Sequence, residues 1–177
     1  MNLSKRFPSI LQLMPVYAII IAFIYPWSLI RFFWRLPSFL NYATIGEIGV
    51  TYAYLVMFNF LESVVIVLVP IAMSIILPEN WFHERFVTKS ILLVSLGLGY
   101  LVYVASHIVA GAPFPYDLFR WMPAICGLIL ALVFLLDRIA FLRQILIEIS
   151  DRFVIFLYIS IPVSIISLLV ILIRNIL

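Results

Sequence analysis

The stretch "YLVMFNFLESVVIVLVPIAM", residues 54–73, decides the fold of this chain. A run of about 20 apolar residues is long enough to cross the hydrocarbon core of a bilayer as a helix. Glu62 nevertheless lies near the middle of the run, where a carboxylate is costly. The stretch therefore predicts a transmembrane helix, and it raises the question of what makes Glu62 tolerable there.

The composition places the whole chain in the same environment. Of its 177 residues, 66% are hydrophobic and 11% are charged, whereas a soluble domain carries about 25% charged residues. So few charges cannot cover a water-facing surface, which excludes a soluble globular protein. The net charge of +3 is scattered without a basic block, so we expect no nucleic-acid partner. A single cysteine, Cys126, excludes an internal disulfide and a CxxC redox pair.

Five apolar segments predict an all-α, polytopic transmembrane helix bundle that forms one domain, residues 1–177. The expected spans are 13–33, 49–77, 90–110, 119–136 and 153–173. Four spans are the alternative, if the first or the fourth segment is re-entrant or lies in the interface. Because no small-residue cleavage site follows the first apolar run, we expect that run to be retained as a span.

An amphipathic segment, "DRIAFLRQILIEISDR" at residues 137–152, separates the last two spans. On a helix its apolar and polar residues fall on opposite faces. The polar face carries Asp137, Gln144, Glu148 and Asp151. We expect a helix that extends the fourth span or lies on the membrane surface, and a docking helix for a partner is the alternative.

The distribution of Lys and Arg predicts the orientation. With a cytoplasmic N-terminus, five spans place seven basic residues inside and four outside, in agreement with the positive-inside rule. The inside set is Lys5, Arg6, Arg85, Lys89, Arg138, Arg143 and Arg152, and the outside set is Arg31, Arg35, Arg120 and Arg174. We therefore predict an integral, multi-pass membrane protein whose N-terminus is cytoplasmic.

Glu62 belongs to a polar stripe on the helical wheel of the second span. The stripe comprises Glu62, Asn59, Ser63 and Tyr52, with Thr51 and Ser74 beside them. No Lys, Arg or His lies at mid-depth in another predicted span, so Glu62 has no internal counter-charge. Burial disfavours a charged carboxyl group, and we expect Glu62 to be largely protonated and hydrogen-bonded in a helix–helix seam. That seam is internal or shared with a partner subunit, and a proton or substrate relay is the remaining alternative.

Tyr100, Tyr103 and His107 share one polar face of the third span. This face is typical of a tyrosine-rich helix seam, and a quinone or lipid-headgroup site is the alternative. The only other histidine, His83, lies 24 residues earlier, which is about 36 Å along a helix. One chain cannot bring both imidazoles to one haem iron, and we expect no cofactor and no metal site.

Ser160, Ser164 and Ser167 share one face of the fifth span, at positions i, i+4 and i+7. Small hydroxyl residues let transmembrane helices approach closely and share hydrogen bonds, each contributing about 0.5–2 kcal/mol. The pattern therefore predicts a helix-packing seam.

No constellation of catalytic residues is recognisable, because HExxH, GxSxG and P-loop patterns are all absent. His83 and Glu84 are consecutive, so on a helix their side chains point about 100° apart. The sequence favours a non-enzymatic accessory, anchoring or structural subunit whose partners are membrane lipids and other membrane protein subunits or a second copy of itself. The alternatives are a transporter or proton-conducting component that uses Glu62 and, with less support, an interfacial lipid-modifying enzyme that uses His83, His107 or Glu84.

Overall fold

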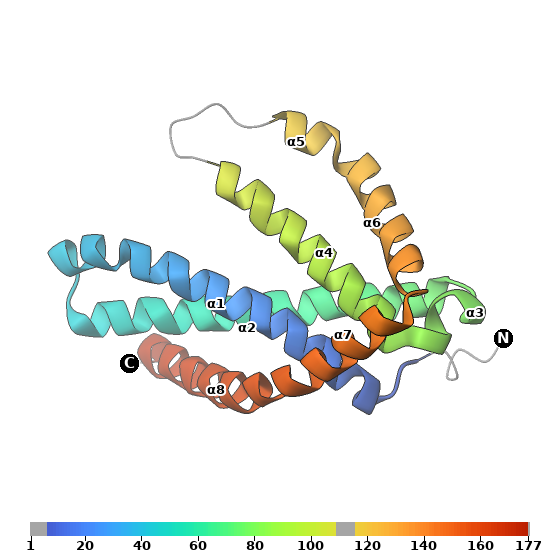
Figure 1. The fold of residues 1–177 in the computed structure, drawn as a ribbon. Coiled ribbons are helices and arrows are strands. Elements are labelled where there is room, and N and C mark those ends of the chain that lie inside the picture. The colour runs from blue at the N-terminus through green and yellow to red at the C-terminus, as the bar shows by residue number, and fades with distance from the viewer. Residues whose placement is uncertain (1–6, 109–115, 177) are drawn as a thin grey trace.

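The computed structural model describes residues 7–108 and 116–176, and that part of the chain is built of helices without any strand (Figure 1). In chain order the elements are α1 (Ile10–Tyr42), α2 (Ile45–Ile76), α3 (Glu79–Phe82), the short 3-10 helix η2 (His83–Arg85), α4 (Phe86–His107), α5 (Tyr116–Arg120), α6 (Met122–Leu136), α7 (Ala140–Phe153) and α8 (Ile155–Ile176). The predicted all-α class is confirmed.

Four helical segments are long and apolar enough to cross a membrane, namely α1, α2, η2 with α4, and α7 with α8. The shorter helix α6 is also apolar, but its 15 residues extend only about 22 Å. Four of the five predicted spans therefore correspond to long helices, and the span expected at 119–136 corresponds to this shorter one. The fold is that of a multi-pass helical membrane protein. The predicted end of the third span at 110, and Lys5 and Arg6, lie outside the described residues.

A capping box closes the hairpin between α1 and α2. The hydroxyl of Thr44 accepts a hydrogen bond from the Glu47 backbone N–H, and the Glu47 carboxylate accepts one from the Thr44 backbone N–H at 2.8 Å. These two bonds satisfy N–H groups that would otherwise lack partners at the start of a helix. Because only two residues separate α1 from α2, the two helices run antiparallel along each other (Figure 1).

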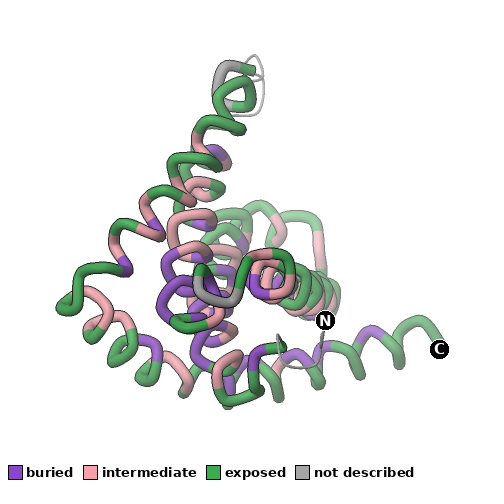
Figure 2. Tube along the Cα trace, turned by 90° about the vertical axis from the view of Figure 1, so that its right-hand side faces the viewer, coloured by how far each residue is buried: buried purple, intermediate pink, exposed green. Residues whose placement is uncertain are grey.

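The hydrophobic core lies where α1 meets α3 and the first half of α4. Val16, Ile20, Phe82, Phe86 and Ile91 are almost fully buried in one cluster there. Helix α8 packs along α1 and α2, whereas α4 leaves the core toward its C-terminal end and forms, with α6, an arm that diverges from the α1–α2–α8 bundle (Figure 1). Buried residues gather in the middle of the molecule, and the far end of the arm is largely exposed (Figure 2). The bundle and the arm are thus joined at only one end.

The amphipathic segment forms α7, but it is not a simple continuation of α6. Helix α6 ends at Leu136, and α7 begins at Ala140, after three intervening residues. Asp137, which the sequence pattern places on the polar face of the helix, is instead 4% exposed in the turn between them. The physical reason is that its carboxylate pairs with two basic side chains from the start of α4, as described below.

Candidate functional site

The polar stripe of α2 is divided between two surroundings, and its inner part faces α1. The Asn59 side-chain amide donates a hydrogen bond to the Ser28 hydroxyl at 2.5 Å, and the hydroxyls of Ser63 and Tyr17 are hydrogen-bonded at 2.9 Å. Both Asn59 and Ser63 are buried. This part of the stripe therefore links α2 to α1 through hydrogen bonds within the bundle.

Glu62 points away from that seam and is exposed on the flank of the monomer. The buried residues of α2 are Ala53, Val56, Asn59, Ser63, Pro70 and Ser74. On a helical wheel Glu62 lies roughly 110° from the centre of this buried face. We expected its carboxyl group to be hydrogen-bonded to the stripe, but within the described residues it has no hydrogen-bond or ion-pair partner. The carboxyl group is therefore available to something outside the monomer.

Glu62 lines a groove of about 580 Å³ between α1, α2 and α4. Its lining residues come from α1, α2 and α4, and Figure 1 shows that α4 diverges from the other two helices toward its C-terminal end. Most of its lining is apolar or aromatic, including Phe23 and Trp27 from α1, Phe58 and Val65 from α2, and Leu98 and Leu101 from α4. A lone carboxyl group in such surroundings is expensive unless it is paired or hydrogen-bonded. This combination makes the groove the candidate functional site.

The depth of Glu62 increases that cost. It lies near the midpoint of α2, 17 residues after Ile45 and 14 before Ile76. Arg31 is the basic residue one turn beyond the groove-lining Trp27 on α1, and its guanidinium stacks on the Trp27 ring at 5.1 Å from the centroid. It makes no ion pair with Glu62 among the described contacts. The groove therefore holds a carboxyl group at mid-depth that no basic side chain in the described part of the chain pairs.

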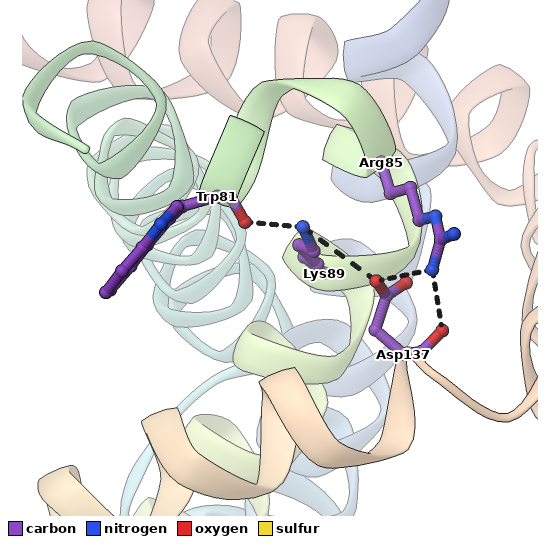
Figure 3. A network of polar contacts seen from close by, with 4 residues as sticks. All are labelled: Trp81, Arg85, Lys89 and Asp137. Carbon is purple, nitrogen blue, oxygen red and sulfur yellow. Dashed lines mark hydrogen bonds and ion pairs between the residues drawn. The ribbon is translucent and has the colours of Figure 1, made fainter. Parts of the chain in front are cut away.

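A second polar cluster lies at the end of the molecule where α4 begins and α6 ends (Figure 3). The Lys89 ammonium donates a hydrogen bond to the Trp81 carbonyl and lies 3.8 Å from Asp137 Oδ2, which also accepts from Arg85 at 3.3 Å. The same ammonium lies 5.6 Å from the centroid of the Phe134 ring. Each of the three charged groups is thus paired, so the cluster serves to hold the arm and α7 onto the start of α4.

The predicted polar face of Tyr100, Tyr103 and His107 lies on one continuous helix, α4, and two of its members contact each other. Tyr103 is exposed and its ring packs against that of His107 in a tilted arrangement with centroids 4.4 Å apart, and the His107 Nδ1 lies 2.9 Å from the Tyr103 carbonyl oxygen. Tyr100 lines a separate, almost wholly apolar cavity of about 330 Å³ between α2, α4 and α6. Neither tyrosine nor the histidine lines the Glu62 groove.

The predicted serine face of α8 is buried, and Ser160, Ser164 and Ser167 are each 5% exposed. The Ser164 hydroxyl is hydrogen-bonded to the Tyr25 hydroxyl of α1 at 2.7 Å and donates to the Ser160 carbonyl at 2.7 Å. Tyr52 is half-buried nearby and lines, with Tyr25 and Ser160, a cavity of about 220 Å³ between α1, α2 and α8. These residues all lie inside the bundle.

The candidate acid–base residues are likewise dispersed. The His83 Nδ1 lies 3.4 Å from the Ser74 hydroxyl, while Glu84 is exposed and His107 lies at the other end of α4. Among the residues that the structure describes, no group of three or more His, Cys, Asp or Glu side chains is placed to hold a metal ion.

Fold and site together define a multi-pass helical membrane protein with a carboxyl-bearing groove on its side. No protein-family model, no curated protein sequence and no solved structure matches this chain. Its function is therefore argued from the groove and the residues that line it.

Proposed function

We propose that this protein is a non-enzymatic accessory subunit of a membrane complex and that its Glu62 groove packs against another membrane protein. The observation that supports the proposal is the exposure of Glu62 at the midpoint of α2, without a partner in the described part of its own chain. A charge at the bilayer centre costs from about 2.5 to more than 10 kcal/mol, depending on how it is estimated. A partner that covers and pairs the carboxyl group removes most of this cost.

The lining of the groove favours a packing role over conduction of protons or substrates. A relay needs a series of titratable groups, and Glu62 is the only titratable side chain among the described residues that line the groove. Two other polar side chains of the groove, Ser28 and Asn59, are already hydrogen-bonded to each other. A lipid-modifying role has less support still, because His83, Glu84 and His107 do not converge on one pocket.

We also propose that the N-terminus is cytoplasmic. The basic residues Arg85, Lys89, Arg138, Arg143 and Arg152 belong to η2, the start of α4, the α6–α7 turn and α7, at the end of the bundle where α1 begins (Figure 1). Of the expected outside set, Arg31, Arg35 and Arg174 belong to the parts of α1 and α8 that run toward the α1–α2 hairpin. Arg120 belongs to α5, at the far end of the arm. The more basic end faces the cytoplasm under the positive-inside rule.

Purification from native membranes in a mild detergent tests the subunit proposal. The wild-type chain is expected to elute in a complex of fixed stoichiometry with a second membrane protein, and Glu62→Gln and Glu62→Leu are expected to weaken or abolish that complex. Glu148→Gln is the matched control, because Glu148 is an exposed carboxylate of α7 that pairs with Arg152. A wild-type chain that elutes alone, or a complex indifferent to both Glu62 variants, contradicts the proposal.

A further inference from the structure

We infer that the partner fills the Glu62 groove with a basic side chain, so that the partner is a transmembrane helix carrying one Arg or Lys at mid-depth. This inference rests on the proposed function, since it names the chemistry of the subunit that covers the groove. It concerns the same site but makes a separate claim, which is that an ion pair or charge-assisted hydrogen bond to Glu62 selects the partner.

The dimensions of the groove fit side chains that project from part of a helix. Its lining runs from Phe58 to Ile66 on α2 and from Leu98 to Ala105 on α4, which is about 12 Å and about 10 Å of helix. A full span covers about 30 Å of hydrocarbon. The groove therefore receives the side chains of about two helical turns of a partner, and one long side chain among them reaches Glu62.

The chemistry of the lining suits a cation. The Glu62 carboxyl group is the one acidic group in the groove, and the aromatic side chains of Phe23, Trp27 and Phe58 are all part of the lining. Aromatic faces attract Arg and Lys, and this attraction strengthens when water is absent. Trp27 already holds the Arg31 guanidinium of its own chain at 5.1 Å. A basic side chain entering from outside thus meets a carboxyl group and exposed aromatic rings together.

Pairing two copies of this chain through the groove does not bring a described basic residue to Glu62. A two-fold dimer brings identical surfaces together, so pairing through the groove places a second Glu62 opposite the first. No described Lys, Arg or His is among the residues that line the groove, and the Arg31 guanidinium is already stacked on Trp27. His83 and His107 lie at the two ends of the η2–α4 span. The basic group therefore belongs to a different protein.

Designed peptides test the inference without knowledge of the natural partner. The purified protein is placed in phosphatidylcholine vesicles with a synthetic 21-residue transmembrane peptide of leucines that has Arg at its centre, and binding is measured by energy transfer between fluorophores. A matched peptide has Leu at the centre, and both peptides have the same flanking residues. We expect the Arg peptide to bind roughly tenfold more tightly than the Leu peptide, the range of one intramembrane polar interaction.

The variants decide whether Glu62 is responsible. Glu62→Gln is expected to bring the two peptides to within about twofold of each other, while Glu62→Asp and the control Glu148→Gln keep the preference for Arg. Circular dichroism and gel filtration check that each variant is folded. Equal binding of the two peptides to the wild type overturns the inference, and so does a preference that survives in Glu62→Gln.

Two further results separate this inference from a small-molecule site and from the subunit proposal. In the first, binding of the lipophilic cation tetraphenylphosphonium to the protein is measured without any peptide. If this cation binds in a Glu62-dependent way while the Arg and Leu peptides bind equally, the groove is a small-molecule site and the inference is overturned. A stoichiometric native complex whose partner has no Arg or Lys within a span also overturns it, while leaving the subunit proposal intact. A chain that purifies alone instead contradicts the subunit proposal itself.

Discussion

Replacing Asp137 with Asn removes the carboxylate that pairs the buried Lys89, and we expect the variant to lose about 3–5 kcal/mol in the free energy of unfolding. Lys89 is 6% exposed and Asp137 4%, with the ammonium nitrogen and Oδ2 separated by 3.8 Å. At an effective dielectric constant of about 20, two unit charges at this distance attract each other by about 4 kcal/mol. The mutation leaves the buried Lys89 without its carboxylate partner, which is costly.

The contacts that survive place the expected loss at the lower end of this range. Lys89 keeps its hydrogen bond to the Trp81 carbonyl and its position over the Phe134 ring. Arg85 contributes less than Lys89, because its side chain is 45% exposed and exposed ion pairs contribute at most about 1 kcal/mol. We therefore expect a loss of about 3 kcal/mol.

Equilibrium unfolding of the purified protein in mixed micelles, followed by circular dichroism as the denaturing detergent is increased, measures this loss. Glu148→Gln breaks the exposed pair with Arg152 and serves as the control, with an expected effect below about 0.5 kcal/mol. The double variant Lys89→Met with Asp137→Leu removes both buried charges and is expected to recover most of the stability. An Asp137→Asn variant as stable as the control, or a double variant no better than the single one, refutes the reasoning.

Three further predictions concern helix packing and helix ends, and the same unfolding measurement checks them. Tyr25→Phe removes the hydrogen bond to Ser164 and is expected to lower the free energy of unfolding by about 0.5–1.5 kcal/mol. The control Tyr158→Phe, at an exposed position, is expected to change it by almost nothing. Equal effects of the two variants contradict a stabilising Tyr25–Ser164 hydrogen bond. Thr44→Ala removes the capping box and is expected to cost about 1 kcal/mol, and a Ser replacement that fails to restore stability contradicts this. Gly99→Ala is expected to be tolerated or to stabilise α4 by up to about 1 kcal/mol, because an added Cβ meets no atom within 4 Å; a loss above about 1 kcal/mol contradicts this.

The helices were predictable because a chain in a bilayer satisfies its backbone hydrogen bonds locally. Each apolar run of sufficient length must form a helix, and the run around Glu62 became α2 for that reason. The shared face of Ser160, Ser164 and Ser167 was equally predictable, since positions i, i+4 and i+7 lie on one face of any helix. Local periodicity therefore predicted the helices and the residues that share a face.

Which side a polar residue faces could not be predicted in the same way. A helical wheel groups Glu62 with Asn59 and Ser63 but does not say where the neighbouring helices lie. In the structure α1 covers Asn59 and Ser63 and leaves Glu62 at the edge of the contact. The polar stripe is broader than the contact that one neighbouring helix makes.

Pairings between distant segments could not be predicted from the sequence for a related reason. Asp137 and Lys89 are 48 residues apart, and Tyr25 and Ser164 are 139 residues apart. The polar pattern of residues 137–152 placed Asp137 on a solvated face, because nothing local indicates that two basic residues of another helix lie beside it. Only the packing of α4 against α6 and α7 reveals that the carboxylate is buried.

The claim that another membrane protein covers the Glu62 groove is tested most directly by photo-crosslinking in native membranes. A photoreactive side chain replaces Val65, which lines the groove, and in a separate variant it replaces Ile166, which is similarly exposed on α8. We predict that position 65 crosslinks to one membrane protein, that this product disappears when Glu62 is also replaced by Leu, and that position 166 does not form it. Crosslinks from position 65 to lipid alone, or the same product with and without Glu62, contradict the claim.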